Sequence, residues 1–178
     1  LSDSTWPGYS VGVDVMKGYM LSALEIVAQC PHTPTHLFLQ AGVGGLAAAI
    51  ALYLREAYGH ELRIIVVEPD RAPALQLAIQ KGALCDAGEG VSIMGRLDCK
   101  RASLSALDTL ARHANDFVTL TDEDVEHRLP KMATLGLETS PSGGAGLAAA
   151  LMSLDEGAFG INSTSRILCV VSEGIIDD

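Results

Sequence analysis

The feature that most constrains the fold is an apolar, strand-like run that stops at glycines and restarts as an alanine-rich helix. It lies in the stretch THLFLQAGVGGLAAAI. A strand that turns directly into a helix leaves the first backbone N–H groups of that helix unpaired, and these groups carry partial positive charge. Glycines at positions 42, 44 and 45 keep side chains out of that space, so a phosphate fits there. The alternative to a phosphate site is that the glycines only allow a tight strand-to-helix turn, in which the alanines pack closely.

Strand and helix patterns alternate along most of the chain. Short apolar runs predict strands in RIIVVE, DFVTLTD and RILCVVS, and ALCDAG is a candidate for a further short strand. RIIVVE is β-branched and continuously apolar, which is typical of a parallel strand buried on both faces. Helical patterns separate these runs, beginning with residues 11–29. The order predicts an α/β fold with three αβα layers around a doubly wound, mostly parallel sheet.

Small residues follow three of the predicted strands or open the helices beyond them. They occupy 42–45, 142–144 and 172–174. In doubly wound sheets ligands bind outside the carboxyl ends of the strands, so the site is expected at this edge. Ser103 is expected to cap the helix in SLSALDTLARHAN, and Pro130 to interrupt the helix in DEDVEHRLPKMAT.

Composition narrows the classes of partner. The 178 residues carry a formal net charge of −10, which argues against nucleic acid as the main partner, because phosphate backbones require clustered Lys and Arg. No apolar run approaches the roughly 20 residues of a membrane span. The four cysteines form no CxxC pair, and the five histidines show no metal-ligand spacing, so free thiols and no metal site are expected.

A dinucleotide site is one interpretation of the glycine loop. GVGGLA fits the pattern G-x-G-x-x-G/A, and Glu68 ends the next strand at a spacing suited to a ribose hydroxyl. A long helix precedes this strand, however, whereas the dinucleotide fingerprint usually opens its domain. Adjacent glycines also suit a single isolated phosphate, and Pro69 after Glu68 suits the start of a helix.

The order of several segments resembles another family. DSTWPGY, THLFLQAGVGGLAAA, IIVVEPDRA, PSGGAGLAAAL and CVVSEGIID resemble the C-terminal part of fold type II enzymes that use pyridoxal 5'-phosphate (PLP). Diaminopropionate ammonia-lyases are similar along nearly the whole chain. The resemblance implies that residues 1–178 form part of the large PLP-binding domain, without the lysine-bearing N-terminal part and without the small domain.

The resemblance also implies residue roles. Backbone amides of the glycine loop would bind the cofactor phosphate, and this role falls on Gly42, Val43, Gly44, Gly45 and Leu46. Ser172 matches the hydroxyl that bonds to the pyridine nitrogen, and a hydroxyl can donate to an unprotonated ring nitrogen. Asp3 matches an active-site aspartate that is expected to be catalytic, contacting the substrate's second ammonium group or taking its proton.

The Schiff-base lysine has no match in this chain. The four lysines, Lys17, Lys81, Lys100 and Lys131, lie outside the family's lysine motif. Reversible exchange of an imine with a substrate amine requires a lysine. These 178 residues alone are therefore expected to be inactive.

The activity implied is α,β-elimination of 2,3-diaminopropionate to pyruvate and ammonia by a PLP-dependent carbon–nitrogen lyase, in a cytoplasmic homodimer that binds a small amino acid. A threonine or serine dehydratase of the same scaffold is the nearest alternative. An NAD-binding domain of an oxidoreductase that uses Gly42, Gly44 and Glu68, and a fragment that binds no ligand, are alternatives of other classes.

Overall fold

The computed structural model describes residues 3–6, 8–9 and 11–175. Helices and strands alternate along this part of the chain. They are α1 (Val11–Gln29), β1 (His36–Gln40), α2 (Gly45–Tyr58), β2 (Arg63–Pro69), α3 (Ala74–Lys81), α4 (Leu104–His113), β3 (Asp116–Leu120), α5 (Asp122–Glu126), α6 (Leu129–Thr134), α7 (Pro141–Glu156), the 3-10 helix η1 (Ala158–Gly160) and β4 (Ile167–Cys169).

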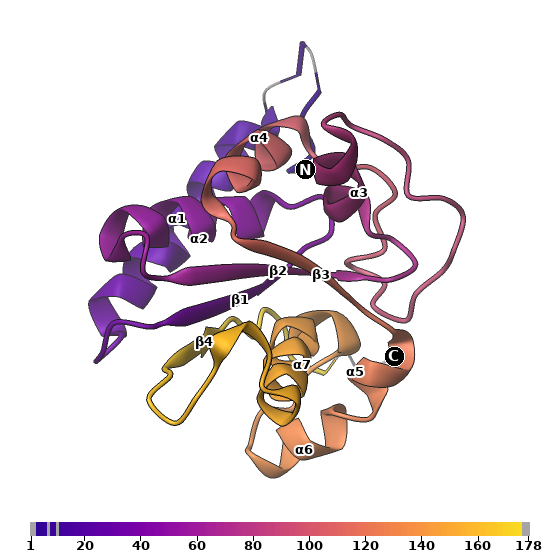
Figure 1. Ribbon diagram of the computed structural model, residues 1–178. Coiled ribbons are helices and arrows are strands. Elements are labelled where there is room, and N and C mark those ends of the chain that lie inside the picture. Colours follow the sequence, from indigo (N-terminus) through magenta and orange to yellow (C-terminus); the bar gives the residue numbers. More distant parts are fainter. Residues whose placement is uncertain (1–2, 7, 10, 176–178) are drawn as a thin grey trace.

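The four strands form one parallel sheet in the order β3-β2-β1-β4. Helices α1 to α4 lie on one side of the sheet and α5 to α7 on the other (Figure 1). The predicted three-layer, doubly wound α/β fold is therefore confirmed. The two central strands, β1 and β2, carry their carboxyl ends toward the same edge, which is where ligands bind in such sheets.

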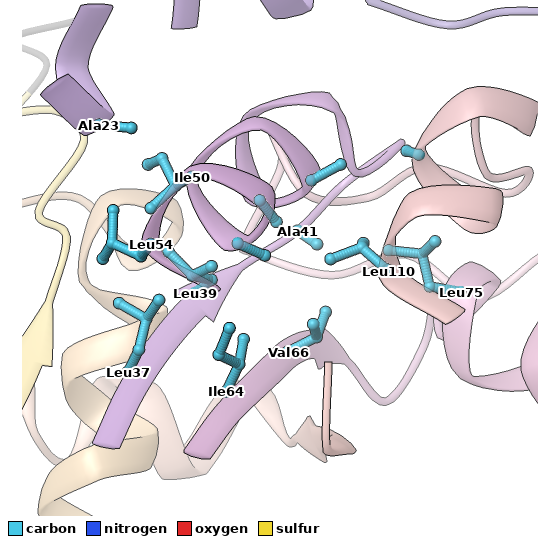
Figure 2. Close-up of a cluster of buried hydrophobic side chains, with 14 of the residues drawn as sticks. Ala23, Leu37, Leu39, Ala41, Ile50, Leu54, Ile64, Val66, Leu75 and Leu110 are labelled. Atoms are coloured by element: carbon cyan, nitrogen blue, oxygen red, sulfur yellow. The ribbon is translucent and has the colours of Figure 1, made fainter. Parts of the chain in front are cut away.

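Side chains of the central strands alternate between two separate hydrophobic cores, one on each face of the sheet. Leu37, Leu39, Ile64 and Val66 pack with α2, α3 and α4, and Figure 2 shows these side chains facing α2. Phe38 and its neighbours in β2 point the other way, toward α7. Because successive strand residues face opposite sides, a strand covered on both faces must be apolar throughout, as RIIVVE is.

Two strand predictions require correction. Residues 83–88 of ALCDAG form no strand. This segment bonds instead to a loop, through Ala87 N–H and Lys100 O. RILCVVS was predicted as a buried strand, but β4 covers only three residues and is half-buried, because it lies at the edge of the described sheet.

The helix predictions at Ser103 and Pro130 were correct in position. Pro130 stands in the first turn of α6, after a break between α5 and α6. Ser103 precedes α4, but its side chain makes no capping bond to that helix. Its hydroxyl instead accepts a hydrogen bond from Thr5 N–H at 3.0 Å, so it holds the N-terminal segment.

Within residues 3–6, 8–9 and 11–175, no helix has the length and apolar character needed to cross a membrane. The same part of the chain contains no group of three His, Cys, Asp or Glu side chains placed to hold a metal ion. All four cysteines are free thiols.

Candidate cofactor site

The loop after β1 turns sharply at Gly44. This residue precedes α2 with φ 99°, a left-handed conformation that favours glycine, and it offers α2 no side-chain cap. The first backbone N–H groups of α2 are therefore free to bond to another group. Gly42 lies against a neighbouring loop, where a Cβ atom would come within 2.9 Å of Arg96 O.

A carboxylate occupies the amino end of α2. The Asp3 side chain accepts hydrogen bonds from the backbone N–H groups of Gly45 and Leu46. A Cβ atom built on Gly45 would overlap the Asp3 carboxylate, so the absence of a side chain at Gly45 makes this contact possible. Burial raises the pKa of Asp3, while the two amides act in the opposite direction. These amides thus hold an anionic group of the protein itself, and the phosphate contact expected of residues 42–46 stays a prediction.

Thr5 fixes the segment that carries Asp3. Its hydroxyl accepts a hydrogen bond from Ser105 N–H at 2.8 Å, and its carbonyl accepts one from Leu104 N–H at 3.1 Å. Thr5 thus caps α4 from a distant part of the chain, in the role expected for Ser103. Sequence reasoning missed this contact, because a helix cap is normally sought next to its own helix.

The loop lines a cavity of about 400 Å³ at the carboxyl end of β1. The residues to which the PLP-enzyme resemblance gave roles all lie in its wall: Asp3, Gly42, Val43, Gly44, Gly45, Leu46 and Ser172. The structure therefore brings the two ends of the chain and the glycine loop together. Their individual roles remain predictions.

Several lining residues were not identified from the sequence, among them Tyr19, Gln40, Arg96 and Cys99. Gln40 was detectable in principle, since it is a polar residue at the end of an apolar strand. Burial and then the charge of Asp3 raise the pKa of Tyr19. Burial also raises the pKa of Cys99, against a hydrogen bond from Val43 N–H that lowers it. Burial in the cavity therefore favours the neutral forms of Tyr19 and Cys99.

Ser172 is exposed to this cavity and is anchored by Gln40. The Gln40 side-chain amide donates to Ser172 Oγ at 2.9 Å and to Val170 O at 2.9 Å. It also lies 3.1 Å from Gly143 O. The serine is thus held in the chain segment that follows β4, in the wall of the cavity that the glycine loop also lines.

A second cavity of about 990 Å³ adjoins the first and shares Arg96 with it. Arg96 Nε lies 2.5 Å from Glu173 Oε2, and Ser140 Oγ bonds to the other oxygen of that carboxylate. This cavity is larger, but the glycine loop does not line it. The smaller cavity is therefore the candidate site.

Glu68 binds the start of α3 and not a ligand in the cavity. Its side chain is 0% exposed, and its two oxygens accept hydrogen bonds from Leu75 N–H at 2.7 Å and Gln76 N–H at 2.8 Å. It caps α3 and does not line the cavity. Burial raises the pKa of Glu68 to about 7, against these two bonds. A fully buried carboxylate with both oxygens bonded cannot bind a ribose hydroxyl, so this geometry argues against the dinucleotide alternative.

Comparison with known proteins identifies the family of the chain and the cofactor of that family. Residues 5–173 match the family model described as pyridoxal-phosphate dependent enzyme. Diaminopropionate ammonia-lyase of Escherichia coli K12 is 34% identical over 68% of this chain and 32% of its own length. A probable D-serine dehydratase of Vibrio campbellii is 27% identical over 84% of this chain and 35% of its own.

A crystal structure of the Escherichia coli diaminopropionate ammonia-lyase, in complex with an aminoacrylate-PLP azomethine reaction intermediate, superposes with a TM-score of 0.81. It is 28% identical, and the match covers 97% of this chain and 48% of the solved one. The chain thus spans about a third of the length of the curated relatives it matches and about half of this solved structure.

The cavity fits pyridoxal 5'-phosphate, and the predicted cofactor is confirmed by the family match. The Gly45 and Leu46 amides bond to the anionic oxygens of Asp3, and Ser172 carries a hydroxyl in the wall of the same cavity. Fold, site and sequence match together place the chain in the family of pyridoxal-phosphate-dependent enzymes.

Proposed function

We propose that the protein is a PLP-dependent ammonia-lyase that converts 2,3-diaminopropionate and water to pyruvate and two molecules of ammonia. The observation that carries the proposal is the Asp3 carboxylate bound by the bare amides of Gly45 and Leu46 inside a cavity that also contains Ser172. The identity of 34% with a diaminopropionate ammonia-lyase supports the choice of substrate.

In this proposal the amides of residues 42–46 bind the cofactor phosphate, and Ser172 donates its hydroxyl proton to the ring nitrogen. When bound, the cofactor supplies an electron-accepting ring that stabilises negative charge at the substrate Cα. The amides of Gly45 and Leu46 cannot serve two anions at once, so the Asp3 carboxylate would leave them when the cofactor phosphate is bound. Asp3 is then available to bind the substrate's second ammonium group or to take a proton from it.

We assign the Schiff-base role to none of the four lysines of this chain. None of them lines the candidate cavity. Lys17 pairs with Asp14 on the exposed side of α1, and Lys100 bonds to Asp98 and to Gly90 O. We propose that residues 1–178 belong to the large, cofactor-binding domain and hold the phosphate and the ring.

The proposal also includes a cytoplasmic homodimer. Leu21 and Leu24 on α1 are 64% and 44% exposed, which supports association through an apolar surface. Light scattering on a gel-filtration column measures the mass directly. A monomer across the micromolar range would contradict this part of the proposal.

The decisive experiment uses the full-length enzyme that contains these residues, loaded with PLP, and compares 2,3-diaminopropionate, serine and threonine as substrates. Release of pyruvate with two equivalents of ammonia from diaminopropionate, at the highest kcat/KM of the three, is expected. A higher kcat/KM for serine or threonine would overturn the proposed substrate and favour the dehydratase, which the 27% identity to a probable D-serine dehydratase makes the second candidate. NADH fluorescence that changes on titration, with no PLP binding, would overturn both.

A further inference from the structure

Gln40 is a buried amide in an otherwise apolar strand. It ends β1 and is 4% exposed. Its nitrogen lies within hydrogen-bond distance of Val170 O, Ser172 Oγ and Gly143 O, which come from two other segments of the chain. Burial of an amide is costly unless it is hydrogen-bonded, so these contacts determine how the side chain is held.

The two carbonyls fix which end of the amide faces them. Val170 O and Gly143 O can only accept hydrogen bonds, so the nitrogen of Gln40 must point toward them. Oε1 then lies over α7, where it has no hydrogen-bond partner in the described part of the chain. Gly146 makes room for this oxygen, since a Cβ atom there would come within 2.6 Å of it.

This orientation has a consequence for Ser172. An amide nitrogen donates and does not accept, so Ser172 Oγ cannot donate its proton in its 2.9 Å contact with Gln40. Gln40 shares its two amide protons among Ser172 Oγ, Val170 O and Gly143 O, and the serine oxygen is an acceptor in that contact. The hydroxyl proton of Ser172 therefore remains available to another acceptor. Ser172 is exposed and lines the 400 Å³ cavity, so an acceptor inside the cavity can take that proton.

We propose that Gln40 is a positioning residue that makes Ser172 a donor to the cofactor's ring nitrogen. This inference rests on the proposed cofactor-binding mode, and it assigns a role to a residue that acts through the serine. Because the contact with Gln40 uses Ser172 Oγ as an acceptor, it does not consume the hydroxyl proton and leaves that proton for the ring nitrogen. The site is thereby matched to an unprotonated pyridine nitrogen.

The test uses the PLP-loaded protein and PLP labelled with ¹⁵N in the ring, whose chemical shift reports hydrogen bonding to that nitrogen. Ser172→Ala is expected to move the resonance to that of an unbonded pyridine. Gln40→Met should move it in the same direction by a smaller amount and weaken PLP binding about fivefold, the effect of one hydrogen bond. The double variant should match Ser172→Ala, because Gln40 acts only through the serine.

Gln76→Met is the matched control. Its side chain also donates to a backbone carbonyl, Phe117 O at 2.9 Å, but Gln76 does not line the cavity. This variant should leave the ring resonance unchanged. If Gln40→Met lowers the unfolding temperature yet leaves the resonance where it is in the unmodified protein, Gln40 is merely structural and the inference is overturned.

A second measurement needs no variant, in case Gln40→Met does not fold. A hydroxyl that donates its proton becomes a better acceptor, so the Gln40 side-chain amide protons should move downfield when PLP binds. An unchanged amide resonance on loading would overturn the inference. These spectra are recorded without substrate, so they can fail or succeed independently of the proposed elimination reaction.

Discussion

Helices α2 and α7 begin with the same kind of sequence, glycines followed by an alanine-rich run, but their glycines do different things. At α2 the Gly44 cap has no side chain, and the amides of Gly45 and Leu46 hold the Asp3 carboxylate in a cavity. At α7 Ser140 caps the helix by accepting from Gly143 N–H at 3.0 Å.

The glycines of α7 instead allow close packing. A Cβ atom on Gly143 would come within 2.6 Å of Thr139 Oγ1, and one on Gly144 within 2.8 Å of Thr139 Cγ2. The difference teaches that a glycine-led helix binds an anion only where no side chain of its own has satisfied its first amides. Substitutions of the α2 glycines are therefore expected to change ligand affinity, and substitutions of the α7 glycines to change stability.

Gly45→Ala is expected to have the largest effect. The added methyl group takes the place now held by the Asp3 carboxylate, so anionic oxygens can no longer reach the two amides. Losing two charge-assisted hydrogen bonds should weaken PLP binding about a thousandfold. Titration of PLP followed by its absorbance measures the change. Unaltered affinity would contradict the assignment of the phosphate to this loop.

Helix α3 is a third case in the comparison, because the buried Glu68 carboxylate accepts hydrogen bonds from its first amides. Burial raises the pKa of Glu68 from 4.5 to about 7, so between these values the folded state binds more protons than the unfolded state. The free energy of unfolding should therefore fall by about 3 kcal/mol as pH rises from 4.5 to 7. The contribution is complete below pH 4.5 and lost above the folded pKa.

Urea unfolding of the unmodified protein and of Glu68→Gln, from pH 5 to pH 8, isolates this contribution. The variant should lack that part of the pH dependence, because its side chain does not titrate. A difference between the two proteins that stays constant with pH would show that the amides of Leu75 and Gln76 fully offset the cost of burying the charge.

Gly144→Ala tests the packing side of the comparison. Its methyl group would meet Thr139 Cγ2 at 2.8 Å and Met132 Sδ at 3.1 Å, so the neighbours must shift. Overpacking of this kind should lower the free energy of unfolding by about 2 kcal/mol. PLP affinity at the other helix should stay within about twofold of the unmodified protein, the pattern opposite to Gly45→Ala. A large loss of PLP affinity would remove the distinction between α2 and α7.

Asp3→Asn is expected to have the smallest effect. Removing the negative charge weakens the internal competitor for the Gly45 and Leu46 amides, so inorganic phosphate should bind about tenfold more tightly. Isothermal titration calorimetry measures this affinity. Asp14→Asn, which removes one charge at an exposed ion pair on α1, is the control and should leave phosphate affinity unchanged. Equal phosphate affinity in all three proteins would show that Asp3 and phosphate do not share a site.

The sequence by itself determined the fold class, the glycine loop and the family. These depend on local properties: alternating strand and helix patterns, glycines at the start of a helix, and segments in a fixed order. The sequence also placed Ser172 and the loop at strand ends, where a parallel sheet gathers its ligands. The strand prediction for ALCDAG was wrong because apolar character alone does not show whether a segment pairs with the sheet, and Ala87 N–H bonds instead to Lys100 O in a loop.

The tertiary structure alone decided which polar groups meet. Asp3 bonds to amides more than 40 positions away, Gln40 to Ser172 across 132 positions, and Thr5 to Ser105 across 100. No local pattern encodes such pairs, since each partner looks like a solvated or strand-end residue in its own segment. These contacts depend on the sheet, which brings distant strand ends to one edge. Polar groups that become buried there form hydrogen bonds with one another.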